Sequence, residues 1–186
     1  MMTMDSYELK IGPIVRELPI VKVSDSLAIA SFVLLGDTEL VEAAADALVG
    51  FPSFPRGEVD LLVCPEAKAI PLAHAMAVRL KVNYVVVRKA IKAYMREPLV
   101  ESVSSITTAG AQTLVLDGPE RKALAGKRVC VVDDVVSTGG SLRSLERILA
   151  KTGCTVVAKA AVLLEEGGYE GPDLLYLARL PIFRLG

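Results

Sequence analysis

Residues Arg128–Ser141 read RVCVVDDVVSTGGS and indicate, in order, a strand, an acidic pair, a small polar loop and the start of a helix. The run from Val129 to Val132 is apolar and rich in β-branched residues, which is typical of a strand buried on both faces of a parallel sheet. Two carboxylates, Asp133 and Asp134, follow this run. Beyond the loop, apolar residues recur at helical spacing: Leu142, Leu145, Ile148 and Leu149.

Each residue type in this turn suits the binding of a sugar phosphate. Gly139 and Gly140 permit positive φ angles and a close approach of the backbone to a ligand. Successive N–H groups at a helix N-terminus, helped by Ser and Thr hydroxyls, can hold a phosphate. The carboxylates of Asp133 and Asp134 can accept hydrogen bonds from two neighbouring hydroxyls, as on a ribose. A phosphate pocket one loop away from a diol pocket describes a site for ribose 5-phosphate.

Other interpretations of the turn need features that can be sought in the sequence. An apolar strand followed by Asp-Asp also suits the metal-holding strand of a nucleotide triphosphatase, but the required G-x-x-x-x-G-K-[ST] loop is missing. Dinucleotide binding needs G-x-G-x-x-G after a strand, and this motif is also missing. A purely structural turn, with the acidic pair in solvent, remains as the alternative.

Length and composition limit the class of protein. At 186 residues, 52% of them hydrophobic, the chain fits a single domain with a sizeable core. Its formal net charge of −1 gives no general basic field, so no nucleic acid partner is expected. The sequence shows no signal peptide or membrane-length apolar run, which predicts a soluble cytoplasmic protein without membrane contact. Three cysteines without metal-ligand spacing are expected to be free thiols: Cys64, Cys130 and Cys154.

The order of predicted elements indicates an α/β fold with a parallel sheet. Strands are expected at 7–11, 20–23, 59–64, 83–87, 114–116, 129–132, 155–164 and 174–177. Pro13 and Pro19 are expected to interrupt the first two of these strands, 7–11 and 20–23. The pattern of 24–35 does not distinguish helix from strand, and 118–127 is assigned to a polar link. Helices are expected after a cap at Asp37 or Thr38, from Pro71 and over 142–149.

Three loops that follow strands should gather at one edge of the sheet, where ligands bind in such folds: 65–70, 88–97 and 133–141. Four cations belong to these loops: Lys68, Arg88, Lys89 and Lys92. They could balance the charge of a departing diphosphate, although a solvated basic turn is the competing interpretation. The segment 90–113 shows no strong period, and long connections of this kind are often lids.

The segment VVDDVVSTGGS resembles the phosphoribosyl diphosphate signature of type I phosphoribosyltransferases. Pro65-Glu66-Ala67-Lys68 and Val87-Arg88-Lys89 are similar to further motifs and make the adenine phosphoribosyltransferase branch the most similar one. The resemblance covers about residues 58–165 and implies a single domain over 1–186. Its core, 58–164, would be a type I phosphoribosyltransferase-like parallel sheet flanked by helices. The chain ends, 1–57 and 165–186, would form a small hood.

The resemblance also assigns roles to residues. The positions that it implies for binding phosphoribosyl diphosphate are Glu66, Ala67, Lys68, Arg88, Lys89, Lys92, Asp133, Asp134, Val136, Ser137, Thr138, Gly139, Gly140 and Ser141. Asp133 and Asp134 are the catalytic candidates, and residues 92–113 resemble a mobile catalytic loop. Mg²⁺ would enter with the bound diphosphate, with the two aspartates as candidate ligands. Lys68 and Ala69 depart from the Arg-Gly of adenine enzymes; lysine keeps the charge but loses the planar, two-pronged donor.

The candidate contacts to the base are Leu27, Ala28, Ile29 and Ser137. Enzymes for hypoxanthine and guanine usually carry aspartate in place of Ser137, and adenine enzymes usually carry alanine, so serine is closer to the adenine pattern. The Phe-Arg-Asp that adenine enzymes often have near the base is not found in LAIAS (27–31), and core packing is an equal alternative for 27–29. Glu101 is the candidate for the family's loop glutamate near the purine.

The implied reaction is displacement of diphosphate at the anomeric carbon by a purine ring nitrogen, through a ribooxocarbenium-like state without a covalent nucleophile. The leading expectation is a purine salvage enzyme that makes AMP from adenine and phosphoribosyl diphosphate with Mg²⁺, and a homodimer from the resemblance alone. The alternatives are specificity for xanthine or hypoxanthine, and a regulator that senses phosphoribosyl diphosphate without catalysis. His74, the single histidine, lies on a predicted helix and is expected to be structural.

Overall fold

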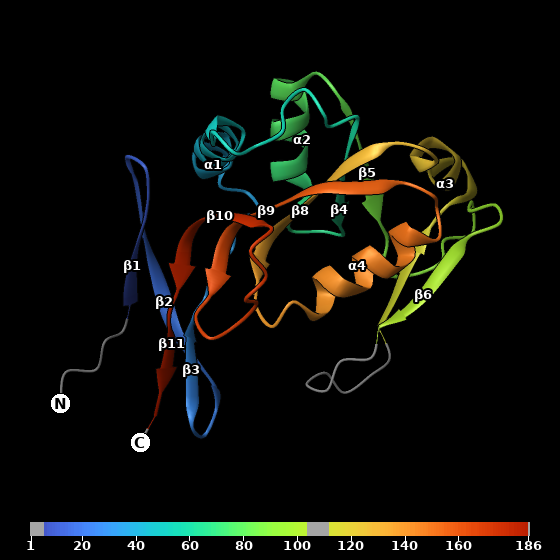
Figure 1. The fold of residues 1–186 in the computed structure, drawn as a ribbon. Helices are drawn as coiled ribbons and strands as arrows, with labels where there is room; N and C mark the ends of the chain where they lie inside the picture. The colour runs from blue at the N-terminus through green and yellow to red at the C-terminus, as the bar shows by residue number, and fades with distance from the viewer. Residues whose placement is uncertain (1–5, 104–111, 186) are drawn as a thin grey trace.

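A computed structural model describes residues 6–103 and 112–185 of the chain. Its centre is a parallel sheet with the strand order β10-β9-β8-β4-β5 (Figure 1). These strands are β4 (Leu61–Pro65), β5 (Asn83–Val87), β8 (Arg128–Val136), β9 (Thr155–Glu165) and β10 (Leu174–Leu180). Every neighbouring pair in this sheet is parallel, so the predicted α/β fold with a parallel sheet is confirmed.

Four helices occur in the described residues: α1 (Thr38–Gly50), α2 (Ile70–Leu80), α3 (Gly118–Leu124) and α4 (Gly140–Ala150). Figure 1 shows α1 and α2 on one face of the central sheet and α4 on the other. Asp37, one of the two predicted cap residues, caps α1, because its Oδ1 accepts from the Leu40 N–H at 3.1 Å. Pro71 lies in the first turn of α2, where no N–H is needed. No helix over residues 6–103 or 112–185 combines the length and the apolarity needed to cross a bilayer.

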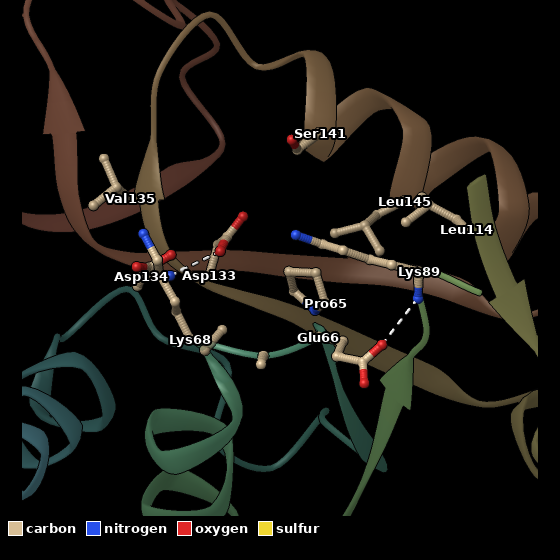
Figure 2. A pocket seen from close by; sticks show the side chains of 12 residues that line it. Pro65, Glu66, Lys68, Lys89, Leu114, Asp133, Asp134, Val135, Ser141 and Leu145 are labelled. Carbon is tan, nitrogen blue, oxygen red and sulfur yellow. Dashed lines mark hydrogen bonds between the residues drawn. The ribbon is translucent and has the colours of Figure 1, made fainter. Parts of the chain in front are cut away.

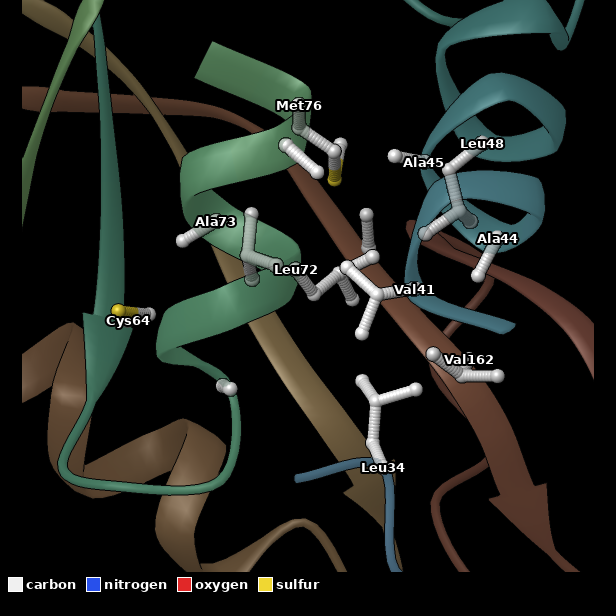
Figure 3. Close-up of a cluster of buried hydrophobic side chains, with 14 of the residues drawn as sticks. Leu34, Val41, Ala44, Ala45, Leu48, Cys64, Leu72, Ala73, Met76 and Val162 are labelled. Carbon is white, nitrogen blue, oxygen red and sulfur yellow. The ribbon is translucent and has the colours of Figure 1, made fainter. Parts of the chain in front are cut away.

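Strand β4 shows how the central sheet is buried on both faces, since successive residues of a strand point in opposite directions. Leu62 and Cys64 belong to the cluster that α1 and α2 cover, whereas Leu61 and Val63 belong to the cluster that α4 covers. Figure 3 shows Leu72 of α2 within the first cluster. Burial on both faces explains why this strand reads as a continuous apolar run.

The chain ends form a second, antiparallel sheet with the order β1-β2-β3-β11: β1 (Ser6–Ile11), β2 (Ile14–Ser24), β3 (Leu27–Ala30) and β11 (Ile182–Arg184). The expected interruption at Pro19 is wrong, because β2 runs through this residue. Pro19 lies opposite Ser6, the first residue of β1, where the missing N–H of proline removes little of the hydrogen bonding between the strands. The Pro19 carbonyl accepts from the Ser31 N–H at 2.8 Å. Three-residue β11 is too short to give a periodic signal.

The segments that were expected to form a hood divide between the two sheets. Strand β10, within 165–186, pairs in parallel with β9 and becomes an edge of the central sheet. Helix α1, within 1–57, packs on α2 and the central sheet. Arg16 of β2 joins the small sheet to the start of α1, because its guanidinium binds Asp37 and Glu39, each at 2.7 Å. This pairing lowers the pKa of the Asp37 carboxyl.

Between β5 and β8 the structure corrects two expectations. Strands β6 (Leu99–Val103) and β7 (Gln112–Leu116) pair as an antiparallel ladder, so the segment 90–113 is not wholly irregular. Residues 104–111, part of the expected lid, lie outside the described residues. The expected polar link contains α3, which begins with a capping box: Asp117 accepts from the backbone of the first turn and Glu120 accepts from the Asp117 N–H.

The cysteines are free thiols, as predicted. Cys64 and Cys130 are buried in the central sheet, and Cys154 is half-buried. Burial raises the pKa of the Cys64 thiol and of the Cys130 thiol to about 12. Both groups are therefore protonated at neutral pH and behave as small apolar side chains.

We predict that Leu72→Ala destabilises the protein by about 2–5 kcal/mol, because it leaves a cavity in the cluster beneath α1 and α2. Val78→Ala on the same helix is the matched control. The Val78 side chain is 62% exposed, so its loss should change the free energy of unfolding by less than about 0.5 kcal/mol. Urea denaturation followed by circular dichroism measures both variants. Equal losses would contradict this assignment of the core.

Candidate active site

A first cavity lies where the chain leaves two adjacent strands in opposite directions along the sheet, since β4 leads to β5 and β8 leads to β9. Loops diverge at such a switch point and leave a crevice beyond the carboxyl ends of the strands. The cavity has a volume of about 220 Å³ (Figure 2). All three loops expected at this edge contribute to its lining: Pro65, Glu66, Ala67, Lys68, Ala69, Lys89, Leu114, Asp133, Asp134, Val135, Ser141 and Leu145.

Asp133 and Asp134 lie within β8, which continues to Val136 instead of ending before the acidic pair as expected. Each aspartate is only 8% exposed, and the Asp134 N–H donates to Asp133 Oδ1 at 2.9 Å. Burial, and after it the charge of Asp134, raises the pKa of Asp133 well above its ordinary value. The charge of Lys89 lowers the pKa of Asp133, and Figure 2 shows the Lys89 side chain extending toward Asp133. The pair can accept hydrogen bonds from ligand hydroxyls in the cavity.

The facing wall of the cavity is basic and is organised by Glu66. The Lys89 N–H donates to Glu66 Oε2 at 3.1 Å, and Arg88 Nη1 lies 3.8 Å from Glu66 Oε1. These contacts hold the loop after β5 against the loop after β4. Lys68 lines the cavity and is exposed, and the peptide bond between Glu66 and Ala67 is cis. The wall therefore offers cations to an anionic ligand.

A second cavity of about 100 Å³ adjoins the first and is formed by the loop that leads into α4. The two cavities share Asp133, Val135 and Ser141. Gly139, the N-cap residue of α4, has a φ of +81°, a conformation that favours glycine. All of the predicted phosphate-loop positions line this cavity: Val136, Ser137, Thr138, Gly139, Gly140 and Ser141.

The helices that begin at the cavity differ from the others at their N-termini. Aspartate side chains cap α1 and α3, whereas in α2 and α4 no side chain hydrogen-bonds to the first turn. Ala69 at the start of α2 and Ser141 in the first turn of α4 both line the first cavity. Uncapped helix N-termini carry free N–H groups and partial positive charge. Both helices therefore present anion-binding ends to the same space.

The carboxylates of the cavity suit Mg²⁺, but they are too few to form a complete site. Mg²⁺ commonly takes one or two carboxylates together with water and substrate phosphates, and Asp133 and Asp134 supply such oxygens. In the part of the chain that the structure describes, no group of three or more His, Cys, Asp or Glu side chains is arranged to hold a metal ion. A cation here would therefore depend on ligand oxygens.

Some predicted contacts lie away from both cavities. Leu27, Ala28 and Ile29 are in β3 of the small sheet, where they pair with β11, and they line neither cavity. Lys92 is also outside the lining, and its backbone N–H contacts Met95 Sδ at 3.4 Å. The described residues thus bring the phosphate and ribose candidates together with Lys68 and Lys89. Arg88, Lys92 and the β3 candidates for the base line neither cavity.

Glu101 is occupied elsewhere. Its carboxylate binds two cations, Arg147 Nε of α4 at 3.0 Å and Nζ of Lys151, the residue that follows α4, at 2.5 Å. Hydrogen bonds to Lys151 and Arg147 lower the pKa of the Glu101 carboxyl. The expectation that Glu101 approaches the purine is not met in this arrangement, because the side chain ties β6 to α4.

Two residues that the sequence pattern missed support the phosphate loop. Ser137 Oγ donates to Glu165 Oε1 at 2.7 Å, and the Tyr169 N–H donates to the Ser137 carbonyl at 2.8 Å. The Tyr169 ring also lies against Gly139. Glu165 ends β9 at the edge where β8 delivers its aspartates, so its place in the strand was a usable signal. Tyr169 lies in an irregular turn that gives none.

Comparison with known proteins places the chain in a family. Residues 35–181 match the model of the phosphoribosyl transferase domain. The chain is 34% identical over 150 residues to an adenine phosphoribosyltransferase of Mycobacterium tuberculosis (strain ATCC 25618 / H37Rv), an alignment that covers 81% of this chain and 64% of that protein. It is 33% identical over 167 residues to a hypoxanthine/guanine phosphoribosyltransferase of Methanobacterium lacus (strain AL-21), covering 87% and 82%. The chain thus spans just under two thirds of the length of the mycobacterial relative.

Solved structures share the fold. An adenine phosphoribosyltransferase from Thermoanaerobacter pseudethanolicus superposes with a TM-score of 0.67 and 22% identity, covering 95% of this chain and 96% of the other. An adenine phosphoribosyltransferase from Rhodothermus marinus gives a TM-score of 0.66 and 22% identity, covering 94% of both chains. With a domain match over most of its length and relatives above 30% identity, the chain belongs to the type I phosphoribosyltransferase family.

Proposed function

We propose that this chain transfers the 5-phosphoribosyl group from phosphoribosyl diphosphate to a purine base, with adenine as the leading acceptor. One observation carries the proposal: a cavity with a buried aspartate pair adjoins a cavity formed by the loop that leads into the uncapped helix α4. Asp133 and Ser141 line both cavities. A ribose 5-phosphate needs diol acceptors and phosphate donors at this short separation. Family membership supports the same reaction, and the resemblance also supports a homodimer.

In the proposed reaction, the protein holds the reactants in line and shields them from water. Asp133 and Asp134 accept hydrogen bonds from the ribose hydroxyls, and the backbone amides before α4 hold the 5-phosphate. As the bond from the anomeric carbon to diphosphate breaks and the purine nitrogen attacks, the aspartates stabilise the positive charge that develops on the ribose. Lys68 and Lys89 balance the departing diphosphate. Mg²⁺ bound to that diphosphate would supply further electrostatic stabilisation of the leaving group.

The choice of base rests on Ser137 and on the relatives. Proteins of nearly equal identity to this chain carry the names adenine phosphoribosyltransferase and hypoxanthine/guanine phosphoribosyltransferase, so similarity alone does not choose between them. Ser137 lacks the carboxylate that hypoxanthine and guanine enzymes usually have at this position, which favours adenine. Hypoxanthine stands as the second candidate because the relative from Methanobacterium lacus aligns over more of both chains than the mycobacterial relative does.

Purified protein incubated with phosphoribosyl diphosphate, Mg²⁺ and one base at a time tests the proposal. Adenine is expected to give AMP with the highest kcat/KM, ahead of hypoxanthine, guanine and xanthine, as measured by separation of the nucleotide products. A preference for hypoxanthine would replace the assigned base while leaving the reaction in place. If no base yields a nucleotide, the proposed activity is wrong.

We predict that Asp133→Asn combined with Asp134→Asn lowers kcat/KM by at least about a hundredfold, because the site loses the charge that faces the ribose. The fold is expected to persist, since asparagine at position 133 keeps an oxygen for the Asp134 N–H. The pKa of Asp133 is raised in the folded state, so its ionisation costs stability as the pH rises toward that pKa. The midpoint temperature of thermal unfolding of the double variant at pH 8 should therefore not fall below that of the wild type.

The control for this pair is Asp46→Asn, which removes a carboxylate of α1 that binds Arg79 of α2 and lines neither cavity. This variant should keep wild-type kcat/KM in the same assay. Wild-type turnover by the double aspartate variant would contradict the assigned site.

We predict that ribose 5-phosphate binds more tightly as the pH rises from about 7 to about 9, above the second phosphate pKa near 6. The raised pKa of Asp133 leaves part of the free protein protonated in this range, and the proposed site needs the ionised acceptor. Calorimetry in two buffers of different ionisation enthalpy should show proton release on binding. Asp133→Asn should remove both the release and the pH dependence, and a flat wild-type profile would contradict the prediction.

A further inference from the structure

Lys159 of β9 is a buried cation outside both cavities, and it is the one buried Lys or Arg in the part of the chain that the structure describes. Its side chain is 8% exposed. The Nζ atom contacts the carboxylate of Glu146 on α4, lies 2.6 Å from Asp173 Oδ2 and donates to Tyr169 Oη at 3.4 Å. Burial lowers the pKa of Lys159, but Asp173 and Glu146 together raise it above its ordinary value, so the amine is charged.

Stability alone does not account for this charge. Residues on either side of Lys159 in β9 are small and apolar, and a buried ion pair can often be replaced by apolar residues without loss of stability. A buried ion pair can instead fix a particular arrangement of segments. Here the arrangement joins β9, α4 and the turn that connects β9 with β10.

Tyr169 links that turn to the phosphate loop. Its hydroxyl donates to Asp173 Oδ1 at 2.9 Å, within the cluster around Lys159. Its N–H donates to the Ser137 carbonyl at 2.8 Å, and its ring packs so closely on Gly139 that a Cβ there would lie 2.5 Å from Cδ2. The residue therefore contacts the phosphate loop through both its backbone and its ring.

Gly168 shows that the turn and the loop are fitted to each other. A Cβ at Gly168 would lie 2.4 Å from the Ser137 carbonyl oxygen and 2.9 Å from the Glu165 carbonyl oxygen. Gly139 likewise has no side chain at the point where the Tyr169 ring packs. Its φ of +81° is also a conformation that favours glycine. Glycine on both sides thus allows the backbone contact that Tyr169 makes.

We propose that Lys159, Asp173 and Tyr169 form a positioning cluster that holds the phosphate loop in its anion-binding conformation, with Tyr169 as the positioning residue. This inference rests on the proposed function, because it assigns a support to the same 5-phosphate site. A loop of small residues with two glycines loses much conformational freedom when it closes on a ligand. Fixing the loop beforehand lowers that cost and strengthens binding.

The test compares four variants with the wild type: Tyr169→Ala removes the ring from Gly139, Tyr169→Phe keeps the ring and loses the hydroxyl, Asp173→Asn weakens the pairing at a half-exposed carboxylate, and Lys159→Met removes the charge. We expect Tyr169→Ala to weaken ribose 5-phosphate binding by about tenfold and to raise KM for phosphoribosyl diphosphate in parallel. KM for the purine should change by less than about twofold. Tyr169→Phe keeps the ring on Gly139 but loses the hydroxyl that binds Lys159 and Asp173, so an intermediate loss of about threefold is expected.

The matched control is Tyr176→Ala, which removes a half-buried tyrosine of β10 that stacks with Arg179 and contacts neither cavity. It should lower thermal stability without moving KM for phosphoribosyl diphosphate. If Lys159→Met does not fold, Asp173→Asn carries the same test from a position that tolerates polar substitution, and about a threefold loss of affinity is expected.

The outcomes distinguish failure of the positioning role from failure of the proposed function. Wild-type protein that binds ribose 5-phosphate, with Tyr169→Ala and Asp173→Asn binding it equally well, overturns the positioning role alone. Loss of thermal stability in these variants with both KM values unchanged also overturns it, because it shows a merely structural cluster. Wild-type protein that does not bind ribose 5-phosphate overturns the proposed 5-phosphate site and the inference with it.

Discussion

The parallel pairing of β4 with β8 is the constraint on which the site depends. Its register sets Leu61 opposite Val129 and Val63 opposite Val131, so the basic loop after β4 meets the acidic pair of β8. A slip of one residue would turn every side chain of a strand to the other face of the sheet. Asp60 helps to fix the register, because it accepts from the Arg128 N–H at 2.8 Å and pairs with the Arg128 guanidinium. These contacts lower the pKa of Asp60 to about 2.

The same strand shows how function opposes stability in this fold. The apolar part of β8 is buried on both faces and stabilises the sheet, but its last residues bury two adjacent carboxylates. Burial, and after it the charge of Asp134, raises the pKa of Asp133, so the free protein loses stability as the pH rises toward that pKa. The N-termini of α2 and α4, which no side chain caps, also lower the stability of the free protein at the same edge of the sheet. Local rules of stability are commonly broken where a ligand supplies the missing partners.

Much of the central sheet could be predicted because its signals are local. The apolar run of β8, the strand β5 and the cap at Asp37 each depend on neighbouring residues in the chain, and the structure confirms them. Strand β11 and the continuity of β2 through Pro19 were not predicted, and both depend on partners that are distant in the chain. Strand β11 is three residues long and exists because it pairs with β3, and Pro19 is tolerated because of where the β1 pairing ends. Helix α3 was missed although Asp117 and Glu120 gave a capping-box signal.

The sequence by itself determined the chemistry of the site, because the acidic pair, the glycine turn and the cations follow strands whose ends must meet at one sheet edge. Tertiary structure alone decided which of those candidates share a cavity. It brought Lys68 and Lys89 to Asp133, tied Glu101 to α4, and left Leu27–Ile29 in the small sheet. It also placed Tyr169 on Gly139 through a buried lysine ten residues earlier in the chain. Contacts of this last kind join irregular segments, and no periodic pattern of residues encodes where such segments meet.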